Sequence, residues 1–144
     1  FAEGEAASTP ESILSDNVNS AEIVNPYTGK SSLGRKGTVA ATIVNIVKLN
    51  KLIKEASDDQ AIESIINSVD GLIPALEATG LFVLFSPKEW VSKDQPGRTI
   101  LALLYFKHNN LKLDEKIARR IINIVNKTDS KSFKVLAQKV ISQK

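Results

Sequence analysis

The sequence predicts an all-α protein, a compact bundle of five or six helices that follows a flexible N-terminal arm. Two observations lead to this fold class. From residue 37 onward, apolar residues recur at spacings of three and four, which is the period of one helix face. Short segments with capping and turn residues separate these runs, as an antiparallel bundle requires. A chain of 144 residues, 42% of them hydrophobic, has enough apolar material for one such domain.

Residues 1–36 are predicted to form the arm, and residues 37–144 the helical domain. The arm is rich in Ala, Ser, Glu, Asn and Gly, and its apolar residues are scattered, so it has no periodic face to bury. Thr9 followed by Pro10 is a helix-start signal within it. Residues 25–30, which contain Pro and Gly, predict a turn.

The first helix of the domain is predicted from the pattern that begins at residue 37. One side of this helix is apolar and is formed by Val39, Ile43, Ile46, Val47 and Ile53. Ser57 and Gln60 have the spacing of a capping box, which predicts the start of a second amphipathic helix. Residues 70–74 contain Gly and Pro and interrupt that helix. Gly80 is predicted to end a further short turn as a left-handed cap.

Residues 81–85 form an unbroken apolar run between Gly80 and Pro87. Such a run is typical of either a buried strand or a buried helical turn. No second convincing strand is predicted with which it could pair. We therefore favour a helix or a buried connector for this segment.

The central helix of the bundle is predicted over residues 100–106, because these residues are apolar on nearly every side. Before it, residues 86–89 predict a capped start of a short helix that includes Trp90. Residues 94–97 predict a turn. Asn109, followed by a second asparagine, is expected to end the central helix.

Two more helices are predicted in the C-terminal part of the chain. Asp114 is expected to cap the first of them, and residues 128–130 the second. The apolar face of the first is formed by Ile117, Ile121, Ile124 and Val125. The apolar face of the second is formed by Phe133, Leu136, Ala137, Val140 and Ile141. We expect Phe133 and Leu136 to close the core from the C-terminal end.

Composition excludes several classes of site. The chain has no cysteine, which excludes a disulfide scaffold, a thiolate metal site and a cysteine nucleophile. His108 is the single histidine, so a metal site would have to be built from oxygen ligands. The acidic pairs at 58–59 and 114–115 stand in predicted first turns, where carboxylates stabilise the helix dipole. We therefore expect no metal ion and no cofactor.

No catalytic motif appears in the sequence either. Residues 29–31 read Gly-Lys-Ser, but Val24 stands where a phosphate-binding loop requires its first glycine. No nucleophile elbow or Ser/His/Asp order is present. An enzyme is therefore the less expected class of function. If the protein is an enzyme, its site is expected in a pocket near four residues, namely Trp90, Arg98, Tyr105 and His108.

Charge is distributed in blocks along the chain, whose net charge is +3. Residues 1–29 hold five acidic residues and no basic one, and residues 30–54 hold six basic residues and no acidic one. Residues 55–80 again hold six acidic residues and no basic one. Residues 81–144 hold thirteen basic residues against five acidic ones. Such alternation favours association between oppositely charged elements.

The basic residues of the last two predicted helices form a candidate binding face. Its members are Lys112, Lys116, Arg119, Arg120, Lys127, Lys131 and Lys134. This face is expected to bind a partner protein or a polyanion such as nucleic acid, in a salt-dependent manner. Aromatic residues that would stack on bases are missing from it.

We expect a non-enzymatic structural or interaction protein, a component of a larger assembly that docks through its arm and its basic helical face. A chain that starts at Phe1 and lacks both Met and Cys resembles proteolytically matured components of assemblies such as virus particles. Two alternatives stay open: a helical protein that binds nucleic acid or another polyanion, and a small helical enzyme or secreted effector. No apolar run approaches the ~20 residues of a transmembrane helix, so we expect a soluble chain, within an assembly or exported after removal of an upstream segment.

Overall fold

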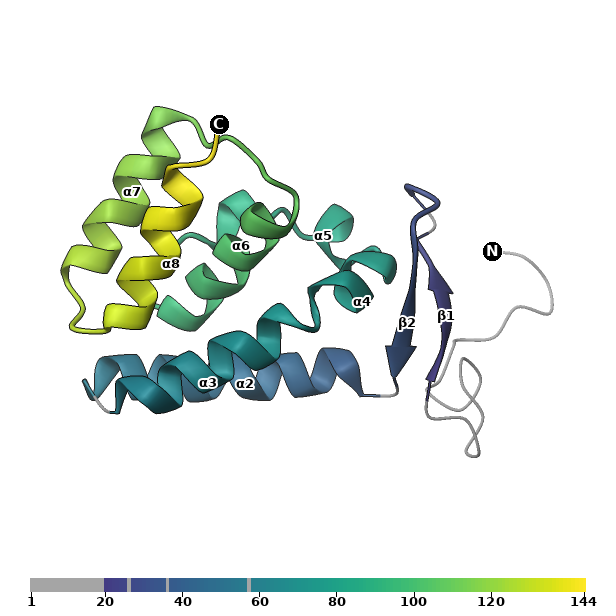
Figure 1. Ribbon diagram of the computed structural model, residues 1–144, viewed down its shortest axis with the longest axis horizontal. Coiled ribbons are helices and arrows are strands. Elements are labelled where there is room, and N and C mark those ends of the chain that lie inside the picture. Colours follow the sequence, from purple (N-terminus) through teal and green to yellow (C-terminus); the bar gives the residue numbers. More distant parts are fainter. Residues whose placement is uncertain (1–19, 26, 36, 57) are drawn as a thin grey trace.

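The computed structural model describes residues 20–25, 27–35, 37–56 and 58–144, and it confirms the all-α fold class (Figure 1). The helices in the described part of the chain pack around one hydrophobic core, whose largest fully buried side chains include Phe106 and Phe133. The predicted helix start at Thr9 lies outside the described residues.

An antiparallel hairpin precedes the helices. Strand β1 (Ser20–Val24) pairs with strand β2 (Ser31–Arg35), and Ser20 lies opposite Arg35 in the register. The predicted turn over residues 25–30 is confirmed, since the Asn25 N–H donates to the Lys30 carbonyl at 2.8 Å. The two strands were not predicted from the sequence. They are short, and their stability comes in part from contact with a helix far along the chain.

That helix is α4 (Ile73–Ala78), against which β2 packs. The Asn25 side chain is buried and its Nδ2 donates to the Glu77 carbonyl, while Lys30 Nζ lies 3.5 Å from a Glu77 carboxylate oxygen. Residues 20–35, which were predicted to be part of the arm, therefore form a structured element against the helices. The domain boundary between residues 36 and 37 stays a prediction.

Helices α2 (Thr38–Lys54) and α3 (Asp59–Asp70) follow the hairpin and lie side by side (Figure 1). Helix α2 buries Thr42, Leu49 and Ile53, which is not the whole apolar side predicted for it. Helix α3 is capped by Asp58, whose side chain accepts the Gln60 N–H at 3.0 Å. The predicted cap at Ser57 lies outside the described residues.

The ambiguous apolar run is helical, as we favoured. Helix α5 (Leu81–Leu84) begins after Gly80, which has a left-handed φ of 84° as its predicted role requires. The expectation that this run is buried is wrong, because only Phe82 is buried while Phe85 is 51% exposed. The next element, η1 (Pro87–Trp90), is a 3₁₀ turn whose predicted side-chain cap does not form.

Helix α6 (Pro96–His108) is the central helix, as predicted. Nine of its thirteen residues are buried, and it contacts α2, α3, α8 and η1. It begins at Pro96, so the turn predicted over residues 94–97 is shorter than expected. The rigid φ of proline suits the first position of a helix, which explains the earlier start. Asn109 follows the last helical residue, as predicted.

Helices α7 (Glu115–Asn126) and α8 (Lys131–Ile141) complete the fold and form an antiparallel pair (Figure 1). Both predicted caps are confirmed. The Asp114 side chain accepts the Ile117 N–H at 2.9 Å, and Ser130 Oγ accepts the Phe133 N–H at 3.1 Å. Among the helices of the described ranges, none combines the length and the apolar character that crossing a bilayer demands.

Candidate functional site

An apolar groove of about 330 Å³ lies between α2 and the start of α6. Helix α5 and the η1 turn complete its walls. It is lined by Val39, Thr42, Ile43, Ile46, Val47, Asn50, Leu81, Phe85, Trp90, Gln95, Arg98 and Leu101. Arg98 is the single charged side chain in this lining. A concave, mostly apolar surface with few polar groups is the usual form of a binding site.

The apolar surface of the groove extends onto exposed parts of α2 and α5. Val39, Ile43 and Val47 follow one another at intervals of four residues on one face of α2, and they are 39–60% exposed. On α5 and just after it, Leu84 and Phe85 are 67% and 51% exposed. Contiguous exposed apolar residues of this size mark interaction surfaces more often than single ones do. We call the face formed by the groove and these residues the apolar face.

Basic residues border the apolar face. Helix α2 contains no acidic residue, and Lys48, Lys51 and Lys54 are exposed in its C-terminal half. Lys51 is one helical turn beyond Val47, and the helical period places Lys54 on the same face as Val47. An apolar occupant of the groove would therefore meet positive charge at this end.

Arg98 occupies a constrained position in the groove wall. Its Nη2 donates to the Glu89 carbonyl at 3.2 Å, which ties the start of α6 to the η1 turn. Its buried Nε has no hydrogen-bond partner. A buried donor without a partner is costly, and an anionic group in the groove would be a favourable neighbour for this guanidinium.

The four residues predicted to surround an enzyme pocket do not converge. Trp90 and Arg98 line the groove, but Tyr105 packs its ring against Phe82 at a centroid distance of 4.6 Å. His108 lies outside the groove, with Nε2 3.7 Å from a carboxylate oxygen of Glu77, whose charge also acts on Tyr105. Burial, with a contribution from the Glu77 charge that Lys30 opposes, raises the pKa of Tyr105. Its phenol therefore stays protonated at neutral pH and is a poor base or nucleophile.

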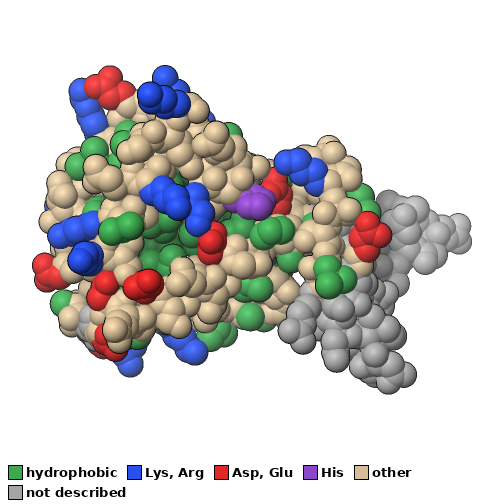
Figure 2. Space-filling view, viewed as in Figure 1, with side chains coloured by type: hydrophobic (Ala, Val, Ile, Leu, Met, Phe, Trp, Pro, Cys, Tyr) green, Lys and Arg blue, Asp and Glu red, His purple; other side chains and the backbone are tan. Residues whose placement is uncertain are grey.

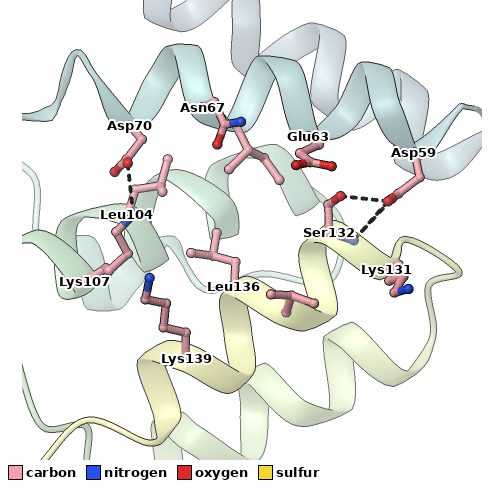
Figure 3. Close-up of a pocket in the computed structure, with 12 residues that line it drawn as sticks. Asp59, Glu63, Asn67, Asp70, Leu104, Lys107, Lys131, Ser132, Leu136 and Lys139 are labelled. Carbon is pink, nitrogen blue, oxygen red and sulfur yellow. Dashed lines mark hydrogen bonds and ion pairs between the residues drawn. The ribbon is translucent and has the colours of Figure 1, made fainter.

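A second cavity of about 360 Å³ lies between α3, α6 and α8 (Figure 3). Its floor is apolar and includes Leu104 and Leu136, whereas its rim carries both acidic and basic side chains. On one side, Lys107 Nζ pairs with Asp70 at 2.9 Å. On the other, Asp59 accepts hydrogen bonds from the first turn of α8. These contacts join elements of the fold, and in the described ranges no cluster of three metal-ligating side chains occurs.

Asp59 links α3 to the start of α8 through hydrogen bonds. Its carboxylate accepts the Ser132 hydroxyl at 2.7 Å and the Ser132 backbone N–H (Figure 3). It also accepts the Ser130 hydroxyl at 2.7 Å. Burial by itself raises the pKa of Asp59, but the hydrogen bonds from Ser132 and Ser130 outweigh it and lower the pKa below its ordinary value of 3.8.

We expect Asp59→Ala to lower the free energy of unfolding by about 1–3 kcal/mol, because two hydroxyls and a backbone N–H lose a charged acceptor. Since the folded-state pKa is the lower one, this stabilisation is present above about pH 3.8 and is lost as the pH falls further. Urea unfolding at pH 7 and pH 3 measures both effects. Glu63→Ala, on the same cavity rim, serves as the control, and an equal effect of the two substitutions would contradict this role.

The predicted basic residues do not form one uninterrupted patch. Lys116, Arg119 and Arg120 share a surface hollow on α7 with Asp114 and Glu115, and Arg119 pairs with Glu115. Lys131 lines the second cavity beside the acidic residues of α3, and it also shares a hollow on α8 with Lys134 and Lys139, in which no acidic residue takes part. Lys112 precedes α7 and Lys127 follows it, both exposed. Figure 2 shows basic and acidic side chains interspersed over the side of the molecule that carries α7 and α8.

The chain matches a known protein family. Residues 14–109 match the family model described as a domain of unknown function, DUF7709. The chain belongs to this family. The DUF7709 region includes every element that builds the apolar groove, from α2 to the start of α6, but neither α7 nor α8. No curated protein and no solved structure matches the chain.

Residues of the groove were largely missed by sequence reasoning. The sequence predicted one apolar side of α2 and no groove, and Val39, Ile43 and Val47 of that side are exposed in the structure. A second apolar set on the same helix, which includes Leu49 and Ile53, is the buried one. The signal that could have shown this is the presence of more apolar residues than a single 3.6-residue stripe accommodates.

Proposed function

We propose that this is a non-enzymatic interaction protein, a component of a larger assembly, which binds an acidic amphipathic helix of a partner through its apolar face. The observation that supports this function is the row formed by Val39, Ile43 and Val47 beside an apolar groove, with lysines at one end. Helices bind such grooves through residues at intervals of three and four.

The charge of the surroundings favours an acidic partner over a second copy of this chain. Residues 30–54 hold six basic residues and no acidic one, so two copies joined through α2 would bring like charges together in either orientation. An acidic segment instead gains from Lys51 and Lys54, and a carboxylate can approach Arg98. A lipid surface is less suited, because it leaves the concave groove unfilled.

The residues that the family model covers favour the apolar face over the C-terminal basic residues as the binding surface. The groove lies within the matched residues 14–109, whereas the basic residues from Lys112 to Lys134 lie beyond them. Acidic neighbours also dilute the positive charge of the hollow on α7 and of the cavity beside α3, whereas none lines the hollow on α8 that Lys131, Lys134 and Lys139 share. Docking through the C-terminal basic residues stays a prediction, whose signature is a steep fall of affinity with salt.

The test uses the partner that copurifies with the native protein, with Val47→Lys as the variant and Val135→Lys as the matched control. The two valines are 60% and 59% exposed but lie on different faces, α2 and α8. A charge in the centre of an apolar interface is expected to weaken binding at least ~10-fold, as loss of a central contact does. Val135→Lys is expected to leave the dissociation constant within about twofold, since a substitution outside an interface removes no contact with the partner.

Isothermal titration of the isolated partner into each variant measures these constants. Circular dichroism confirms that both variants keep their helical content. Equal affinities for the two variants would contradict the proposal, as would a native protein that is isolated without any polypeptide partner.

A further inference from the structure

Residues 1–19 have the composition expected of an occupant of the apolar face. They contain four acidic residues, Glu3, Glu5, Glu11 and Asp16, and no basic residue. They also contain a pair of large apolar residues, Ile13 and Leu14. The sequence thus combines negative charge with apolar side chains, which is the complement of a groove bordered by lysines.

The register of the hairpin fixes where this segment joins the described fold. Ser20 pairs with Arg35 at the open end of the hairpin, and Arg35 is three residues before Thr38, the first residue of α2. Residue 19 is therefore attached beside the N-terminal end of α2. Val39, at the same end, is the first residue of the groove lining. In Figure 1 the start of β1 and the start of α2 lie close together.

The chain is long enough to cover the groove in the same molecule. From Val39 to Val47 a helix rises by about 12 Å, and from Val39 to Lys54 by about 22 Å. Leu14 is six positions before Ser20 in the sequence, and six extended steps of the chain span up to about 20 Å. Leu14 can therefore reach the start of the row at Val39, and residues further from Ser20 can reach the rest of the row and the lysines.

We propose that residues 1–19 dock on the apolar face of their own molecule, with Ile13 and Leu14 against the row Val39, Ile43 and Val47. Glu3, Glu5 and Glu11, which precede Ile13 in the sequence, then face the lysine end of α2. A covalent attachment at the rim gives the segment an effective concentration of about millimolar, which favours the same molecule over a second copy. This inference rests on the proposed function and extends it, because a partner helix must displace the segment before it binds.

The absence of cysteine allows a direct test on the full chain. A nitroxide label on Ser12→Cys is read through the methyl NMR signals of the valines and isoleucines. We expect strong broadening at Val39, Ile43 and Val47 and none at Val135, which is equally exposed on α8. The broadening is expected to persist when labelled protein is diluted into an excess of unlabelled, NMR-silent protein, since the contact lies within one molecule.

A second variant tests the role of charge. Replacing Glu3, Glu5, Glu11 and Asp16 by their amides is expected to reduce the broadening at Val47 several-fold. Broadening absent from the α2 methyl groups, present equally at Val135, or lost on dilution would overturn the inference. If the broadening is absent while Val47→Lys still weakens partner binding, the inference fails and the proposed function stands. If it is present while Val47→Lys leaves partner binding unchanged, the proposed function fails instead.

Discussion

Leu104→Ala is expected to lower the free energy of unfolding by about 2–5 kcal/mol. Leu104 is 0% exposed and lies on α6, the helix that contacts most of the others. Truncation removes apolar surface from the core and leaves a cavity that close-packed neighbours fill only in part. Leu104 also contributes to the floor of the cavity between α3, α6 and α8, so part of the loss can be relieved there.

Urea denaturation followed by far-ultraviolet circular dichroism measures this change. Val135→Ala is the control, because Val135 is 59% exposed on α8 and its truncation is expected to change stability by no more than about 0.5 kcal/mol. If Leu104→Ala lowered the free energy of unfolding by no more than Val135→Ala does, α6 would not be the centre of the core.

Gly97→Ala is expected to destabilise the protein by about 1–3 kcal/mol or more. The cause is steric overlap of the added methyl group with its neighbours, whereas Leu104→Ala leaves a cavity. A Cβ at this position would overlap the Ile46 carbonyl oxygen and lie 3.0 Å from Asn50 Oδ1. The Gly97 N–H donates to that same Asn50 oxygen at 2.7 Å, so α2 and α6 approach closely here. An added methyl group must push the two helices apart and weaken this hydrogen bond.

Gly71→Ala provides the matched control for Gly97→Ala. The nearest atom to a Cβ at Gly71 is the Ser68 carbonyl oxygen at 3.6 Å, an ordinary contact, and the residue has a helical φ of −65°. Thermal unfolding of the two variants is expected to show a lowered midpoint for Gly97→Ala and little change for Gly71→Ala. A midpoint for Gly97→Ala equal to that of the native chain would show that α2 and α6 are less tightly packed.

Local sequence signals predict much of the helical part of this fold. Asp114 and Ser130 cap the helices that they were expected to cap, because a side-chain oxygen one step before a helix satisfies a free N–H regardless of tertiary context. The central helix was likewise identifiable, since residues 100–106 have no polar side to expose.

The hairpin and the groove were not predictable in the same way. Strands β1 and β2 depend on α4, whose Glu77 carbonyl accepts the Asn25 side chain 52 residues away in the sequence. Helix α2 carries apolar residues on more than one side, and the positions of α3 and α6 decide which side is buried. The formation of the hairpin and the choice of the buried side of α2 both depend on packing between residues far apart in the sequence, which a local sequence pattern does not predict.

The most direct test of the apolar face as the interaction surface is a methyl NMR map of the chain titrated with its copurified partner. We expect the signals of Val39, Ile43 and Val47 to shift or broaden on binding, while those of Ile122 and Val135 stay unchanged. Ile122 and Val135 are exposed on α7 and α8, so they report on the surface that carries the basic residues. Changes confined to Ile122 and Val135, with the α2 signals unaffected, would contradict this account of the function.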